Sequence, residues 1–200
     1  QSTRQVVEVG EDFIEDDGEF FTNGGDVTVF GNYYLGAEMG EEPGTALFDL
    51  FAPGILTVVG DFLVGPNGDD DPAGMDDPED LEDEERNRFR LGGGALWLFG
   101  HYEFNGTGDL WEDNLYVASE QGLMGEVYFL GASQQNVFHR QDEDAFFNHV
   151  TMSGEGGILL QEDGWQNDYG TLLLELGIID TADETWEWIL LNPAPETCLA

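Results

Sequence analysis

The residues best suited to cation chemistry are the aspartates of an acidic run near the middle of the chain: Asp69, Asp70, Asp71, Asp76 and Asp77. Ca²⁺ and Mg²⁺ prefer several oxygen ligands, and clustered carboxylates supply them. The run lacks the alternating acids, the central glycine and the final glutamate of an EF-hand loop. Two interpretations therefore remain, a solvated loop that binds cations diffusely and a defined Ca²⁺ or Mg²⁺ site.

An arginine cluster follows directly behind this run. Arg86, Arg88 and Arg90 are three of the five cationic side chains in the sequence. The arginine guanidinium pairs with carboxylates through two parallel hydrogen bonds. The cluster could pair with nearby acids of the same chain, or it could contact the acidic surface of a neighbouring subunit. We assign it to a candidate subunit interface.

Two tryptophans near the end of the chain form the third candidate. Trp186 and Trp188 alternate along an expected strand, so both side chains share one face. They could belong to the packed core, to an interface in which aromatic side chains act as anchors, or to a platform for carbohydrate. We include them in the candidate subunit interface.

Catalytic patterns are weak. His101 and Glu103 share a strand face and His139 lies on a later strand, so a β-barrel could gather them into a metal-dependent active site. The simpler interpretation is that the three histidines, His101, His139 and His149, are unrelated. The sequence has no Gly-x-Ser-x-Gly nucleophile motif, phosphate-binding loop or dinucleotide fingerprint. We therefore predict no enzymatic activity and no obligatory cofactor.

The composition predicts a habitat. Asp and Glu total 43, Lys and Arg total 5, and the formal net charge is −38. All five cations are arginines, because the sequence contains no lysine. In molar salt the Debye length is about 3 Å, so neighbouring carboxylates hardly repel one another. The chain is thus expected to be salt-adapted, from an extreme halophile or a virus that infects one. Such charge argues against nucleic acid and anionic membranes as partners.

Cysteine usage and hydropathy set further bounds. The single cysteine, Cys198, rules out an internal disulfide. No stretch of 18 apolar residues is present, so no transmembrane segment is expected. A first residue other than methionine, Gln1, indicates either a processed or a partial chain.

Short apolar and β-branched runs at roughly ten-residue spacing predict an all-β protein. We detect no internal repeat and expect one domain over residues 1–200, with an N-terminal arm at 1–25 and an inserted acidic loop plus short helix at 65–94. Asn23-Gly24-Gly25 predicts a tight turn, and Asp77-Pro78-Glu79 predicts the start of a helix over 78–88. The expected strands are 26–35, 46–52, 55–64, 95–104, 114–118, 126–132, 136–140, 145–152, 157–161, 171–179 and 185–191.

This rhythm favours a single antiparallel β-sandwich or jelly roll, or a β-barrel. For function we expect a structural assembly subunit in high salt: a capsid, spike or related virion protein of a haloarchaeal virus, or a cell-surface fibre subunit. It would self-associate into an oligomer or lattice, alone or with other structural proteins. The alternatives are a secreted sugar- or surface-binding β-sandwich module, such as an adhesin, and a metal-dependent β-barrel enzyme.

Overall fold

The structure is a computed structural model of the whole chain. It describes residues 5–15, 18–36, 46–51, 53–64, 88–104, 125–139, 149–161, 166–168, 171–180 and 189–191.

Two long sheets, each of seven strands, run the length of the molecule, and every strand pair in them is parallel. In spatial order the first sheet contains β1 (Val6–Val9), β4 (Asp26–Val29), β7 (Ile55–Val58), β10 (Ala95–Leu98), β12 (Glu126–Phe129), β14 (His149–Met152) and β17 (Leu172–Leu174). The second contains β2 (Phe13–Glu15), β5 (Tyr33–Leu35), β8 (Phe62–Val64), β11 (Tyr102–Phe104), β13 (Gln135–His139), β15 (Ile158–Gln161) and β18 (Ile179–Asp180).

Two smaller parallel sheets complete the described strands. A third sheet joins β3 (Gly18–Phe21), β6 (Ala46–Phe51) and β9 (Arg88–Gly92). A two-stranded sheet joins β16 (Gln166–Asp168) to β19 (Ile189–Leu191).

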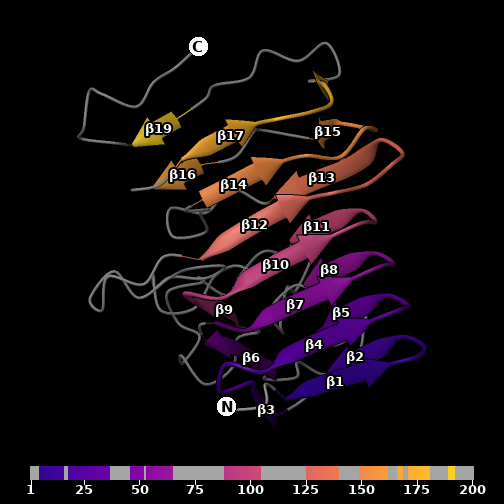
Figure 1. Cartoon of the computed structure of the whole chain (residues 1–200), viewed down its shortest axis with the longest axis vertical. Helices are drawn as coiled ribbons and strands as arrows, with labels where there is room; N and C mark the ends of the chain where they lie inside the picture. Colours follow the sequence, from indigo (N-terminus) through magenta and orange to yellow (C-terminus); the bar gives the residue numbers. More distant parts are fainter. Residues whose placement is uncertain are drawn as a thin grey trace, which may run out of the picture.

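The chain winds as a coil. It runs along one strand of the first sheet, turns a corner and runs along one strand of the second sheet. In the first three coils it then passes through β3, β6 or β9 of the third sheet before it returns to the first sheet one level higher. Figure 1 shows the first-sheet strands stacked as rungs from β1 to β17, with the N-terminal and C-terminal coils at opposite ends. Because each strand pairs with its equivalent in the next coil, the fold is a parallel β-helix.

Each corner between the two long sheets is a short bend at a glycine. In three successive coils the bend contains Gly31, Gly60 and Gly100, each preceded by a first-sheet strand and followed by a second-sheet strand. A Cβ on Gly60 would lie 2.5 Å from the carbonyl oxygen of Gly31 one coil below. The coils approach so closely here that the corner has no room for a side chain.

Two apolar columns fill the interior behind the first sheet. Register pairing stacks alternate residues, so that one column runs from Val7 to Leu172 and the other from Val9 to Leu174. The residues between the ends are at most 2% exposed: Val27, Val29, Leu56, Val58, Leu96, Leu98, Val127, Phe129, Val150 and Met152. Full burial therefore requires a coil on both sides of each residue.

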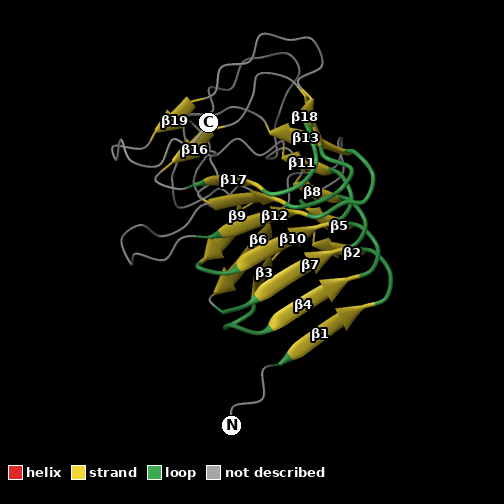
Figure 2. Ribbon diagram, turned by 45° about the horizontal axis from the view of Figure 1, so that its top comes forward, coloured by secondary structure: helices red, strands yellow, loops and turns green. Residues whose placement is uncertain are grey.

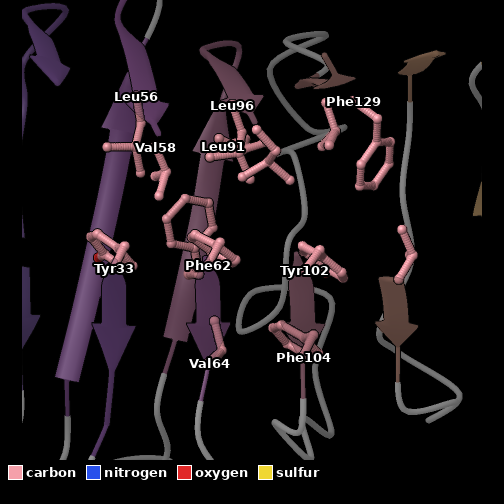
Figure 3. Packing of buried hydrophobic residues seen from close by; sticks show 14 of the residues in the cluster. Tyr33, Leu56, Val58, Phe62, Val64, Leu91, Leu96, Tyr102, Phe104 and Phe129 are labelled. Atoms are coloured by element: carbon pink, nitrogen blue, oxygen red, sulfur yellow. The ribbon is translucent and has the colours of Figure 1, made fainter. Parts of the chain in front are cut away.

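Aromatic side chains stack in the same way behind the second and third sheets. Tyr33, Phe62 and Tyr102 form one stack, with ring centroids 5.2 and 5.6 Å apart and nearly parallel planes. Figure 3 shows these three rings side by side on neighbouring strands. Phe48 and Phe89 form a second stack at 5.2 Å, and it meets the first edge-on. Edge contacts between stacked rings favour one fixed packing of the core.

The all-β prediction is confirmed, but the predicted antiparallel sandwich, jelly roll or barrel is wrong. The segments 26–35, 55–64 and 95–104 were each expected to form one strand, and each forms two strands in different sheets. The corner glycine turns the chain from one sheet into another. Each strand therefore pairs in parallel with the equivalent strand of the next coil, and not with the strand that follows it in sequence. The coil is also the internal repeat that sequence inspection missed.

The local predictions fare differently. The turn at Asn23-Gly24 is confirmed: both residues have positive φ, and the Gly25 N–H donates to the Thr22 carbonyl at 2.9 Å. The predicted helix lies outside the described residues except for Arg88, which begins strand β9. Figure 2 shows only strands and loops in the described part of the chain. In the predicted N-terminal arm, β1, β2 and β3 form the first coil.

Candidate functional site

A ladder of polar side chains follows the corner between the two long sheets. Asp12 Oδ1 accepts the Asn32 N–H at 2.7 Å, and Asn32 Oδ1 accepts the Asp61 N–H at 2.8 Å. Asp61 Oδ1 then accepts the His101 N–H at 2.7 Å, and His101 Nδ1 accepts the Asn136 N–H at 2.9 Å. Each side chain satisfies the backbone of the next coil. This ladder therefore stabilises the corner.

The histidines considered as metal ligands are distributed over this framework. His101 uses Nδ1 in the ladder, while Glu103 is exposed on β11. His139 pairs with Phe104 through the backbone of β13. His149 belongs to the first sheet, where its Nδ1 lies 3.0 Å from an oxygen of the Thr171 side chain. Within the described ranges, no three His, Cys, Asp or Glu side chains are grouped to hold a metal ion.

The outer face of the first sheet carries an aromatic pair. Trp97 of β10 lies beside Tyr128 of β12 in register, with ring centroids 6.0 Å apart and an interplanar angle of 65°. The Tyr128 hydroxyl donates to Glu126 Oε2 at 2.5 Å. That hydrogen bond, with some burial, raises the pKa of Tyr128 to about 12. The indole N–H of Trp97 is buried and has no hydrogen-bond partner within the described structure. We call Trp97, Tyr128 and Glu126 the outer aromatic patch.

One carboxyl group lies inside the β-helix. Glu15, at the end of β2, is 8% exposed and lies 3.4 Å from the Tyr33 hydroxyl, which donates to it. Burial raises the pKa of Glu15 to about 7, and the hydrogen bond from Tyr33 opposes this rise only in part. Burial and the nearby Glu15 carboxylate raise the pKa of Tyr33 well above its usual value. The first coil thus contains a carboxyl group that titrates near neutral pH.

Large apolar side chains are exposed at two kinds of place. At the corner between the long sheets, Phe30, Val59 and Phe99 precede the corner glycines of three successive coils and are 52%, 44% and 42% exposed. We call these three residues the corner column. The other exposed large apolar residues all lie in the first and last described coils: Val6, Val7, Ile14, Phe21, Leu173, Leu174, Leu176 and Ile178.

Most residues predicted for a site lie outside the described residues. This holds for Arg86, for both tryptophans, Trp186 and Trp188, and for the five aspartates Asp69, Asp70, Asp71, Asp76 and Asp77. Arg88 and Arg90 lie in β9 of the third sheet, where their backbones pair with Leu47 and Asp49 of β6. The proposed roles of these residues stay predictions.

Sequence reasoning missed the features that organise the surface. The signal for them is the recurring pattern of two apolar residues, a glycine, a polar residue and an aromatic residue. It occurs as Val29–Tyr33 (VFGNY), Val58–Phe62 (VVGDF) and Leu98–Tyr102 (LFGHY). The glycine marks the corner, the polar residue enters the ladder and the aromatic residue enters the interior stack. Aligning these three segments would have placed the corner column as well.

Comparisons with protein-family models, curated proteins and solved structures match nothing. No helix in the described part of the chain is long and apolar enough to cross a membrane. The fold and its exposed surfaces define a parallel β-helix protein with exposed apolar side chains in its first and last described coils and along one corner.

Proposed function

We propose that the protein is a structural subunit of an assembly that functions in concentrated salt. Its setting would be a virion of a haloarchaeal virus, as a capsid, spike or related protein, or a fibre on a cell surface in a hypersaline environment. The proposal rests on the combination of an acidic sequence without lysine and a β-helix that exposes apolar side chains in its first and last described coils.

The observation that carries this proposal is the exposed apolar surface of a highly charged protein. Eleven large hydrophobic residues in the described structure are at least 42% exposed, although the chain has a formal net charge of −38. Scattered exposed apolar residues are ordinary, but grouped ones indicate contact surfaces. Here eight of the eleven are grouped in the first and last described coils.

Salt makes such contacts possible for this chain. At low ionic strength the net charge of −38 would keep two copies apart. At molar salt the Debye length falls to about 3 Å, so repulsion acts only between charges in near contact. Excluded salts also strengthen the burial of apolar surface. Assembly should therefore strengthen as salt concentration rises.

The test is the mass of the purified full chain as a function of KCl concentration. Sedimentation velocity at roughly 3 M KCl should show a discrete oligomer or a growing polymer, and dialysis to about 0.2 M should dissociate it. A strict monomer at every salt and protein concentration would contradict the proposal. Oligomers that persist in deionised water would contradict its salt dependence.

The outer aromatic patch favours a second candidate, a module that binds sugars or another neutral surface. Trp97 and Tyr128 are both partly exposed, and the Glu126 carboxylate lies beside them. Aromatic rings next to a carboxylate suit sugars, because the rings cover apolar ring faces while the carboxylate accepts hydroxyl hydrogens. Glycan-array binding that is lost in Trp97→Ala and retained in Thr57→Ala would favour this candidate, since Thr57 faces outward in the same register column.

A further inference from the structure

We propose that copies of this protein associate head to tail, with the last first-sheet strand of one copy, β17, pairing with β1 of the next. The proposal rests on the assembly function proposed above and specifies the contact that builds it. It predicts a continuous β-helix that passes from copy to copy.

The interior columns supply the first argument. Val7 and Val9 begin the two apolar columns behind the first sheet, and Leu172 and Leu174 end them. Residues inside these columns are at most 2% exposed, whereas Val7 is 45% exposed and Leu174 is 56% exposed. The two ends differ from the middle because the described structure has no further coil to cover them.

The two ends also match each other. In a head-to-tail contact Leu172 would lie on Val7 of the next copy and Leu174 on its Val9, which continues both columns with residues of the same class. A second copy of this chain is thus the partner whose surface fits by register.

Backbone pairing points to the same partner. In the described residues β1 pairs on one side only, with β4, and β17 pairs only with β14. Strand edges with unpaired N–H and C=O groups are templates for another strand. Figure 1 shows these edges at opposite ends of one stack whose strands all point the same way. A translated copy therefore meets β17 with a parallel β1, the pairing used throughout the fold.

The charges at this contact link it to salt. Glu8 lies in the outward column of β1, in register with Thr28, and would neighbour Leu173 of the preceding copy. Glu175 directly follows β17 and is exposed. The contact thus brings carboxylates of two copies close together, and neither β1 nor β17 contributes an arginine to pair with them. It should form only when their repulsion is screened.

The interface is heterologous, because two different surfaces of the chain meet in it. Such an interface forms open filaments unless rotation closes it into a ring. Blocking one end of each copy therefore has a distinctive consequence. A copy blocked at the C-terminal coil can still receive a partner on β1, and a copy blocked at the N-terminal coil can still donate β17.

The experiment uses the full chain in roughly 3 M KCl and four variants. Val7→Asp and Leu174→Asp place a carboxylate at the exposed end of an interior column. Val59→Asp and Phe30→Asp are the controls, because these corner residues are 44% and 52% exposed against 45% and 56% for the test pair. Circular dichroism and urea unfolding of dilute samples establish that each variant folds.

Each end variant should lose self-association by about 100-fold or more, since the added carboxylate would be buried without a partner. The two end variants mixed together should form a heterodimer and nothing larger, detected by native mass spectrometry with one variant isotope-labelled. The corner controls should assemble as the unmodified chain does.

Three results would overturn the proposal. Assembly unchanged by Val7→Asp and Leu174→Asp but lost in the corner controls would show side-by-side association, and the assembly function would stand. Loss of assembly in Leu174→Asp alone would show a symmetric contact between C-terminal coils. A monomer in which Leu174→Asp chiefly reduces folding stability would show that another part of the same chain covers this end, and the assembly function would fail with it.

Discussion

Replacing Glu15 with glutamine should make the protein more stable at pH 8 and leave its stability nearly unchanged at pH 4. The cause is the buried carboxyl group of the first coil, whose pKa is raised from 4.5 to about 7. Below pH 4.5 the carboxyl is protonated in both folded and unfolded states, so its burial has little effect. Between pH 4.5 and 7 it ionises in the unfolded state only, which favours unfolding. Above pH 7 this destabilisation reaches its full value.

The size of the effect follows from the shift in pKa. Each pKa unit corresponds to 1.36 kcal/mol, so a rise from 4.5 to about 7 corresponds to about 3 kcal/mol. The Tyr33 hydroxyl can still donate to the amide oxygen of Glu15→Gln, so the variant keeps the local hydrogen bond. Its stability should therefore vary less with pH than that of the unmodified chain, by about 3 kcal/mol between pH 4 and pH 8.

The assay is urea unfolding followed by tryptophan fluorescence at several pH values and constant KCl. Glu103→Gln is the matched control, because it makes the same substitution at an exposed position of the second sheet. A gap between Glu15→Gln and the unmodified chain that is the same at pH 4 and pH 8 would refute the reasoning. So would an equal pH dependence of the gap for Glu103→Gln.

Two further predictions concern the core and the corner. Phe62→Ala should lower the free energy of unfolding by about 3–5 kcal/mol, because Phe62 is fully buried in the aromatic stack. Phe99→Ala, in the exposed corner column, should lower it by less than about 1 kcal/mol. Urea unfolding of both variants measures the difference. Gly60→Ala should lower the melting temperature, since the added Cβ would overlap the neighbouring coil. Gly10→Ala should leave it unchanged, because nothing lies within 4 Å of a Cβ at Gly10. Thermal unfolding measures both variants, and equal melting temperatures would argue against a tightly packed corner.

The sequence predicts many strands well because short apolar runs bounded by turn residues mark them. The expected segments 46–52 and 126–132 match β6 and β12 closely, since each is a short and largely apolar run. Such a pattern occurs in parallel and antiparallel strands alike. It therefore carries no information on strand direction, and the roughly ten-residue spacing led us to expect an antiparallel sandwich, jelly roll or barrel.

The β-helix was missed because its repeat is interrupted. Val6 pairs with Asp26, but Ile55 pairs with Ala95, so the chain length of one coil varies widely. The constant part is the short pattern around Gly31, Gly60 and Gly100. Each glycine lay inside a segment predicted as one strand. A glycine within a strand pattern signals a bend or a close backbone approach, and here it signals both.

The candidate site was predictable only in part. Charge and composition supported an expectation of salt-dependent assembly, which needs no knowledge of the fold. The outer aromatic patch depends on register, because Trp97 and Tyr128 lie far apart in sequence and become neighbours only when β10 pairs with β12. The raised pKa of Glu15 likewise depends on its burial beneath the next coil, whose Tyr33 hydroxyl donates to it. Neither pairing can be deduced before the coil is known.

Because the strands are parallel, the carboxyl ends of the second-sheet strands lie along one edge, where the connecting segments can change in length without disturbing the core. The strands β5, β8, β11 and β13 are neighbours in the second sheet, and all of them end at the same edge. The sequence that follows each of these four strands, including the acidic run after β8, begins at this edge. Insertions or exchanged sequences there leave both apolar columns and the corner ladder intact. The loops along this edge can therefore differ in length and sequence while the β-helix that carries them stays the same.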